Sequence, residues 1–178
     1  MSKTTILLLN MLMESISLTW AQDKVHPVIE TFGGIYPIPE ATVRPSSELK
    51  YKVVIDLYSG SESFDKLNPA LNNVARMINL HAIGGAAPKM DIVLAIQGSA
   101  NDIVMRNEHY SVRYNVDNPN VELIKSLKAA GVKLTVCGQS LLASKVDPSQ
   151  VLDEVDIATS MLTTVTTYQL KGYAFLSF

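Results

Sequence analysis

Cys137 is the only cysteine of the chain and the side chain with the most evident capacity for covalent chemistry. Residues 132–136 alternate apolar and polar side chains, which predicts a short strand that ends at Cys137. Gly138 breaks this strand, and a helix is expected over residues 141–145. The thiol is therefore expected at the carboxyl end of a strand, the edge at which open α/β sheets bind their ligands.

The helix start after Cys137 favours the thiolate over the thiol. Gln139 or Ser140 can open the helix, whose positive dipole end stabilises a negatively charged sulfur. The backbone amides of Gly138, Gln139 and Ser140 are the expected thiolate-stabilising groups. A simpler interpretation stands beside this one, because free cysteine is often buried as a small apolar residue. The sequence leaves both roles of Cys137 open.

Two further loops of small polar residues follow strands that are expected to run parallel to the strand of Cys137. Because the carboxyl ends of parallel strands share one edge of a sheet, these loops are expected to line a pocket with Cys137. Turns also favour Gly and Ser for conformational reasons alone, so the pattern fits ordinary loops equally well. The expected pocket-lining residues are Ser59, Gly60, Ser61, Gln97, Gly98 and Ser99.

Strand and helix patterns alternate along the chain, which predicts an α/β fold: a mainly parallel sheet of about five strands flanked by helices. Apolar, β-branched runs mark the strands, and apolar residues at helical spacing mark the helices. The expected strands cover residues 52–58, 90–97, 132–137, 155–159 and 173–178. The expected helices cover residues 65–81, 102–113, 120–130, 141–145 and 160–170.

Residues 1–21 have the features of an export signal peptide. One lysine precedes an apolar stretch over residues 6–13, and small residues near position 21 offer a cleavage point. An amphipathic N-terminal helix is the alternative. The signal predicts a protein exported to the periplasm. Residues 22–50 are rich in Pro, Gly and polar side chains and predict an extended arm, and residues 51–178 form the expected α/β domain.

Composition and motifs argue against several classes of partner and cofactor. The formal net charge of −2, the pI of about 5.9 and the lack of basic runs are untypical of nucleic-acid binding. No apolar stretch reaches the roughly 20 residues that a membrane span needs. Phosphate-loop and dinucleotide-binding glycine motifs are absent and the histidines are scattered, so neither a cofactor nor a metal site is expected.

Several segments of the chain together resemble a known protein family. The most specific is Val-Cys-Gly-Gln-Ser at residues 136–140, and the others are residues 51–58, 97–100, 118–132 and 160–173. On these segments the chain resembles the DsrE/DsrF-like sulfur-relay family, and its exported branch most closely. The resemblance implies flavodoxin-like layering and homo-oligomers. It also implies that the cysteine at position 137 carries sulfur as a persulfide and passes it to a partner thiol.

Three functions are compatible with these features. In the first, the protein accepts sulfane sulfur on Cys137 and transfers it, as a sulfur carrier or sulfurtransferase with a protein donor or acceptor. In the second, it is a non-enzymatic oligomeric binding or assembly module in which Cys137 is a tolerated small residue. In the third, Cys137 is a redox-active thiol that couples to another subunit.

Overall fold

Five parallel strands form one sheet, in the order β4–β3–β2–β1–β5. The computed structural model describes residues 23–178, so the expected export signal lies outside the described residues. The predicted fold class, a mainly parallel five-stranded α/β sheet, is confirmed. The strands are β1 (Tyr51–Leu57), β2 (Met90–Ile96), β3 (Lys133–Cys137), β4 (Asp156–Ala158) and β5 (Ala174–Ser177).

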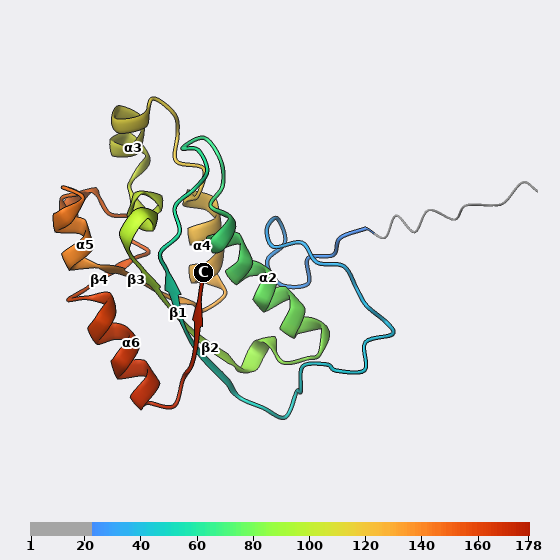
Figure 1. The fold of residues 1–178 in the computed structure, drawn as a ribbon. Helices are drawn as coiled ribbons and strands as arrows, with labels where there is room; N and C mark the ends of the chain where they lie inside the picture. The colour runs from blue at the N-terminus through green and yellow to red at the C-terminus, as the bar shows by residue number, and fades with distance from the viewer. Residues whose placement is uncertain (1–22) are drawn as a thin grey trace, which may run out of the picture.

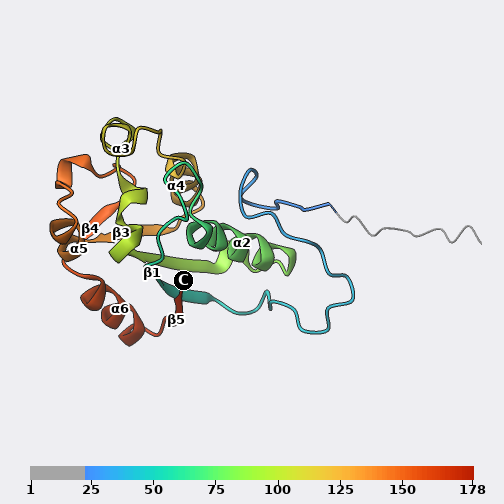
Figure 2. The ribbon, with the colours of Figure 1, turned by 45° about the horizontal axis from the view of Figure 1, so that its top comes forward.

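The helices lie on both faces of the sheet, but unequally (Figures 1 and 2). They are α2 (Pro69–Ile83), α3 (Asn107–Tyr114), α4 (Val121–Ala129), α5 (Gly138–Ala143) and α6 (Met161–Leu170), with short 3₁₀ helices η1 (Ala87–Lys89), η2 (Gly98–Val104) and η3 (Pro148–Gln150). Strands β1 to β4 follow one another across the sheet, so right-handed crossovers place α2 and α4 on one face. The chain then returns to pair β5 with β1, and this reversed step places α6 on the opposite face.

The two faces of the sheet bury very different amounts of apolar surface. Odd-numbered residues of β1, such as Ile55, pack with α2 and α4 in the main core. On the other face, Val54, Val93 and Ala95 pack mainly against Val165 of α6. The second face is therefore thinly covered. The side chain of Cys137 lies on this face, because successive side chains of β3 point to opposite faces of the sheet. No helix among residues 23–178 is long and apolar enough to cross a membrane.

Two helix boundaries differ from those expected from the sequence. The helix expected over residues 65–81 begins only at Pro69, because the Asn68 side chain caps it by accepting from the backbone N–H of Leu71 at 2.9 Å. The prediction of one continuous helix over residues 102–113 is wrong, since η2 ends at Val104 and α3 begins at Asn107.

A remote asparagine accounts for the break between η2 and α3. The Asn118 amide donates to the carbonyl oxygens of Ile103 and Met105, at 2.9 and 2.7 Å. These are carbonyl groups that a continuous helix would pair within itself.

Residues 23–50, here called the arm, contain no helix or strand and one isolated antiparallel bridge, Val25 with Ile35. Asn79, fully buried in α2, holds the first half of the arm through its side-chain amide. Its Oδ1 accepts from the backbone N–H groups of Val28 and Ile29 at 3.0 and 2.9 Å, and its Nδ2 donates to three arm carbonyls. The arm therefore depends on one side chain of the domain for much of its backbone pairing.

We expect Asn79→Ala to lower the free energy of unfolding by about 2 kcal/mol or more, because it leaves buried arm N–H and C=O groups without partners. Urea unfolding measures this loss, and limited proteolysis should show faster cleavage within the arm. The matched control is Asn73→Ala on the same helix, whose side chain makes one exposed hydrogen bond, from Arg76 at 3.2 Å. Equal stability changes in the two variants would contradict the assigned role of Asn79.

Candidate functional site around Cys137

Cys137 ends β3, and the helix α5 begins with the next residue. Across the sheet its Cα pairs with that of Ala158 in β4. The expected strand-end position is thus observed, but the helix starts at Gly138, three residues earlier than expected. The thiol is only 5 % exposed, so it lies just below the surface of the carboxyl edge.

Four polar groups near Cys137 favour its thiolate. They are the Ser140 hydroxyl and the backbone N–H groups of Gln139, Ser140 and Met161, although the Cys137 side chain makes no hydrogen bond of ordinary geometry that caps α5. Burial raises the pKa of the Cys137 thiol, but these donors outweigh burial and hold the pKa below its ordinary value. Gln139 and Ser140 were expected from the sequence. Met161, the first residue of α6, was not, because it reaches the site only through the return of the chain across the second face.

Gly138 lets the first turn of α5 lie directly against β4. A Cβ atom at this position would stand 2.9 Å from the carbonyl oxygen of Ala158, a backbone atom that cannot move aside cheaply. The residue thus serves the close approach of two backbones, whereas the sequence suggested a thiolate-stabilising amide.

The loops after β1 and β2 reach the site through hydrogen bonds. The N–H of Gly98 donates to Ser140 Oγ at 3.4 Å, which leaves the hydroxyl proton of Ser140 free to point at the sulfur. The Ser99 hydroxyl donates to the carbonyl of Tyr58 at 2.7 Å and accepts from the N–H of Gly60 at 3.0 Å. Gln97 turns instead toward β1, where its amide donates to Asp56 Oδ1 at 3.0 Å.

Some of the residues expected at the site fall at two separate cavities, and Cys137, Ser59, Gln97 and Gly98 are not among the residues that line either of them. Gly60, Ser61 and Ser99 line a cavity of about 250 Å³ that also contains Phe64 and Tyr110. Gly138 and Gln139 line another, of about 360 Å³, whose other residues carry no charge: Leu141, Leu142, Val146, Pro148, Ile157, Ala158 and Thr159. The carbonyl oxygen of Ser59 accepts a hydrogen bond from the side-chain amide of Asn68 at 2.8 Å. The uncharged cavity is the one that adjoins the first turn of α5 beside Cys137.

A buried network of asparagines, not anticipated from the sequence, fixes the loops at this edge. Asn120 Oδ1 accepts from the N–H of Asn68 at 2.8 Å, and Asn118 Oδ1 accepts from both the N–H and the amide of Asn120, at 3.0 and 3.1 Å. Three asparagines close to two expected helix starts were the available signal, but single-residue preferences do not show that they meet. Among residues 23–178, no group of three metal-binding side chains comes together.

Comparison with known proteins agrees with this fold. The DsrE/DsrF-like family model matches residues 52–178. Two solved structures are similar, the protein of unknown function MTH1491 from Methanobacterium thermoautotrophicum and the ychN protein from E. coli. Each is 19 % identical and aligns over 72 % of this chain and 99 % of its own, with TM-scores of 0.52 and 0.53 respectively. No curated protein matches the chain. At this identity the two structures establish the fold alone.

We expect Ser140→Ala to raise the pKa of Cys137, because it removes the hydroxyl donor that favours the thiolate. Since the chain has one cysteine, the ultraviolet absorbance of its thiolate during a pH titration, with Cys137→Ser subtracted, measures this pKa directly. Ser126→Ala is the matched control, because that hydroxyl donates to the Glu122 carbonyl on α4. A wild-type midpoint no lower than that of the urea-unfolded chain would refute the assigned thiolate stabilisation.

Proposed function

Because the chain belongs to the DsrE/DsrF-like family, we propose that it accepts and transfers sulfane sulfur as a persulfide on Cys137. The observation that carries this proposal is the position of Cys137 at the end of β3 and the start of α5, where N–H and O–H groups of residues 139, 140 and 161 lower the pKa of its thiol. Such donors favour the thiolate, which is the nucleophile in sulfur exchange. They also suit a persulfide, whose terminal sulfur keeps the negative charge.

The proposed reaction is a pair of sulfur exchanges that need no external oxidant. The Cys137 thiolate attacks the terminal sulfur of a persulfide or polysulfide donor. A new S–S bond forms at Cys137 and the S–S bond of the donor breaks; a persulfide donor leaves as a thiolate, and a polysulfide leaves shortened by one sulfur atom. An acceptor thiolate then attacks the terminal sulfur of the Cys137 persulfide and releases the Cys137 thiolate unchanged.

The burial of Cys137 bears on the alternative functions. Because Cys137 is only 5 % exposed, a disulfide to another subunit requires the surrounding chain to open, and a small polysulfide ion requires less opening than a protein thiol does. The chain has no second cysteine, so no internal disulfide can compete with transfer to another molecule. These features favour sulfur transfer over a redox-active thiol.

Treatment with polysulfide should add the mass of one sulfur atom to the peptide that contains Cys137. We expect Cys137→Ser to abolish this addition, because the hydroxyl is not a nucleophile at neutral pH, and Ser140→Ala to slow it, because less thiolate is present. Mass spectrometry of the digested protein is the measurement. We expect Cys137→Ser to retain the stability of the wild type within about 1 kcal/mol, since serine can keep the same hydrogen-bond donors.

Two results would contradict sulfur transfer by Cys137, and the first of them favours the assembly module. One is a wild-type protein that takes up no sulfur although its fold is intact. The other is sulfur uptake that persists in Cys137→Ser, which would place the sulfur elsewhere. Loss of folding in Cys137→Ser, with a wild-type thiol inert to polysulfide, would mark Cys137 as structural.

We also propose that the protein is a homo-oligomer. Uncharged apolar surface on α6 and β5 supports this, since Leu162 and Leu170 are 68 % and 90 % exposed and Phe175 of β5 is also exposed. Neither α6 nor β5 contains a charged residue. Exposed apolar surface of this kind is typical of an interface, and β5 has a free edge.

Light scattering at micromolar concentration should give a multiple of the monomer mass. We expect the double variant Leu162→Lys/Leu170→Lys to give the monomer mass, because it places charges in the proposed interface. Val112→Lys is the control, since Val112 is equally exposed on α3, among charged neighbours. A monomeric wild type, or an oligomer unaffected by the double variant, would contradict this interface.

A further inference from the structure

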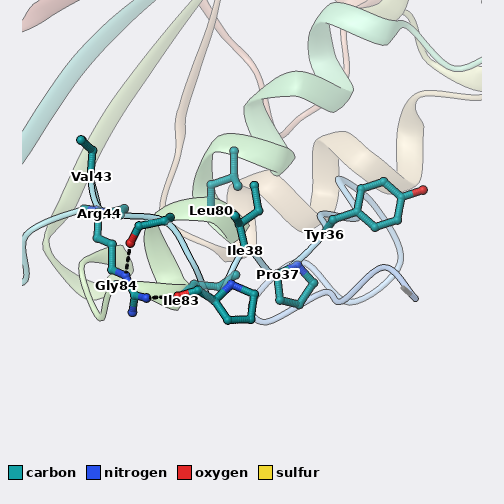
Figure 3. Close-up of a pocket in the computed structure, with 11 residues that line it drawn as sticks. Tyr36, Pro37, Ile38, Val43, Arg44, Leu80, Ile83 and Gly84 are labelled. Atoms are coloured by element: carbon teal, nitrogen blue, oxygen red, sulfur yellow. Dashed lines mark hydrogen bonds between the residues drawn. The ribbon is translucent and has the colours of Figure 1, made fainter. Parts of the chain in front are cut away.

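An apolar groove lies at the edge of the sheet opposite to Cys137. It has a volume of about 620 Å³ and lies between the second half of the arm and the last turns of α2 (Figure 3). Helix α2 follows β1 and runs back along it, so its C-terminal end lies at the amino edge of the sheet, whereas Cys137 lies at the carboxyl edge. The volume falls within the range of roughly 300–1,000 Å³ that is typical of small-molecule sites.

The walls of the groove expose large apolar side chains to solvent. Ile38 and Val43 of the arm are 63 % and 92 % exposed, and Leu80 and Ile83 of α2 are about half exposed. Three prolines, at positions 37, 39 and 45, complete the arm wall. Clustered apolar exposure of this extent marks a surface that binds something, because scattered single residues would be the ordinary pattern.

The groove is a defined structure because the arm is fixed to the domain on both sides of it. Before the groove, Asn79 holds the arm backbone. After it, the arm lies directly on the end of α2, where a Cβ atom at Gly84 would stand 2.7 Å from the Pro45 carbonyl oxygen. The Ser46 N–H then donates to the Tyr51 hydroxyl at 2.9 Å, and Lys89 donates to the Ser47 carbonyl. Residues 36–45 therefore span the gap between two anchors.

Among residues 23–178, Arg44 is the only charged residue that lines the groove. Its guanidinium is fixed by two backbone carbonyls of its own loop, those of Ala41, at 2.8 Å from Nε, and Pro39 (Figure 3). A guanidinium has five N–H donors, so about three remain for a ligand. The neighbouring Glu40 is exposed and does not line the groove. An apolar channel with one oriented arginine matches a molecule with a hydrocarbon chain and a carboxylate.

We propose that this groove binds a free long-chain carboxylate, with its carboxylate on Arg44 and its hydrocarbon chain along Leu80 and Ile83. The charge of the groove favours this occupant, since the Arg44 guanidinium would repel a cationic amphiphile and would form no charge-assisted hydrogen bond with a neutral one. The groove and the thiol lie at opposite edges of the sheet. Binding therefore does not depend on the persulfide function, and either can fail while the other holds.

Isothermal titration of the protein with dodecanoate, below the concentration at which it forms micelles, tests the proposal. We expect one saturable molecule per chain and affinity for dodecylammonium lower by about tenfold or more. We expect Arg44→Gln to weaken dodecanoate binding about tenfold and to leave the binding of dodecanol unchanged, which shows that the groove is still formed. Val43→Ser should weaken all binding, whereas Val112→Ser, at an equally exposed valine on α3, should not.

Four outcomes would overturn the proposal. Three of them are the absence of saturable dodecanoate binding, an affinity for dodecylammonium equal to that for dodecanoate, and unchanged dodecanoate binding in Arg44→Gln. The fourth is a groove with another occupant. Sedimentation with anionic lipid vesicles but no binding of monomeric dodecanoate would indicate a membrane surface, and a protein dimer lost in Val43→Ser would indicate a second copy of the chain.

Discussion

The carboxyl edge of the sheet is held by a chain of hydrogen bonds between side chains and backbone, and this chain ends at the hydroxyl of Ser140, three residues after Cys137. It begins at the buried Asn118 and Asn120 and passes through Asn68 to the loop after β1. Ser99 joins that loop to the loop after β2, and the N–H of Gly98 continues the chain to Ser140. Because each link also satisfies a backbone group of a loop, the loops have little freedom to reorient. The hydroxyl of Ser140 is thereby oriented by residues that never contact the thiol.

The alternation of side chains along β3 explains why Cys137 lies on the thinly covered face of the sheet. Its neighbours in β3, Leu134 and Val136, are buried in the main core, so the alternation of the strand sends the thiol to the other side. Only α6 crosses that side, and it begins beside the site. A thiol on the main face would be enclosed by α2 and α4, far from any small molecule. The reversed last crossover thus supplies both the Met161 N–H near the sulfur and the thin cover of this face.

The sequence permits the prediction of those features that depend on neighbouring residues. The strands are continuous apolar runs, and Cys137 follows one of them directly, so the fold class and the place of the thiol could both be inferred. The break between η2 and α3 could not, because it depends on the amide of Asn118 binding the carbonyls of Ile103 and Met105. For the same reason the contribution of Met161 and the attachment of the arm to Asn79 were not foreseen. In each case the partner lies well away in the chain, and no local preference encodes such a pairing.

Helix α2 joins the two regions to which functions are assigned and also keeps them apart. Its N-terminus is capped by Asn68, which belongs to the hydrogen-bond chain of the carboxyl edge, and its last turns form one wall of the apolar groove. Between these ends, Leu71, Val74 and Ile78 are buried in the main core, so the helix cannot shift as a unit without disturbing that core. A side chain exposed in the groove, such as Val43, can therefore be replaced without moving the donors around Cys137. This separation follows from the packing of α2, and it makes the chemistry of the thiol and the occupancy of the groove independent questions for this protein.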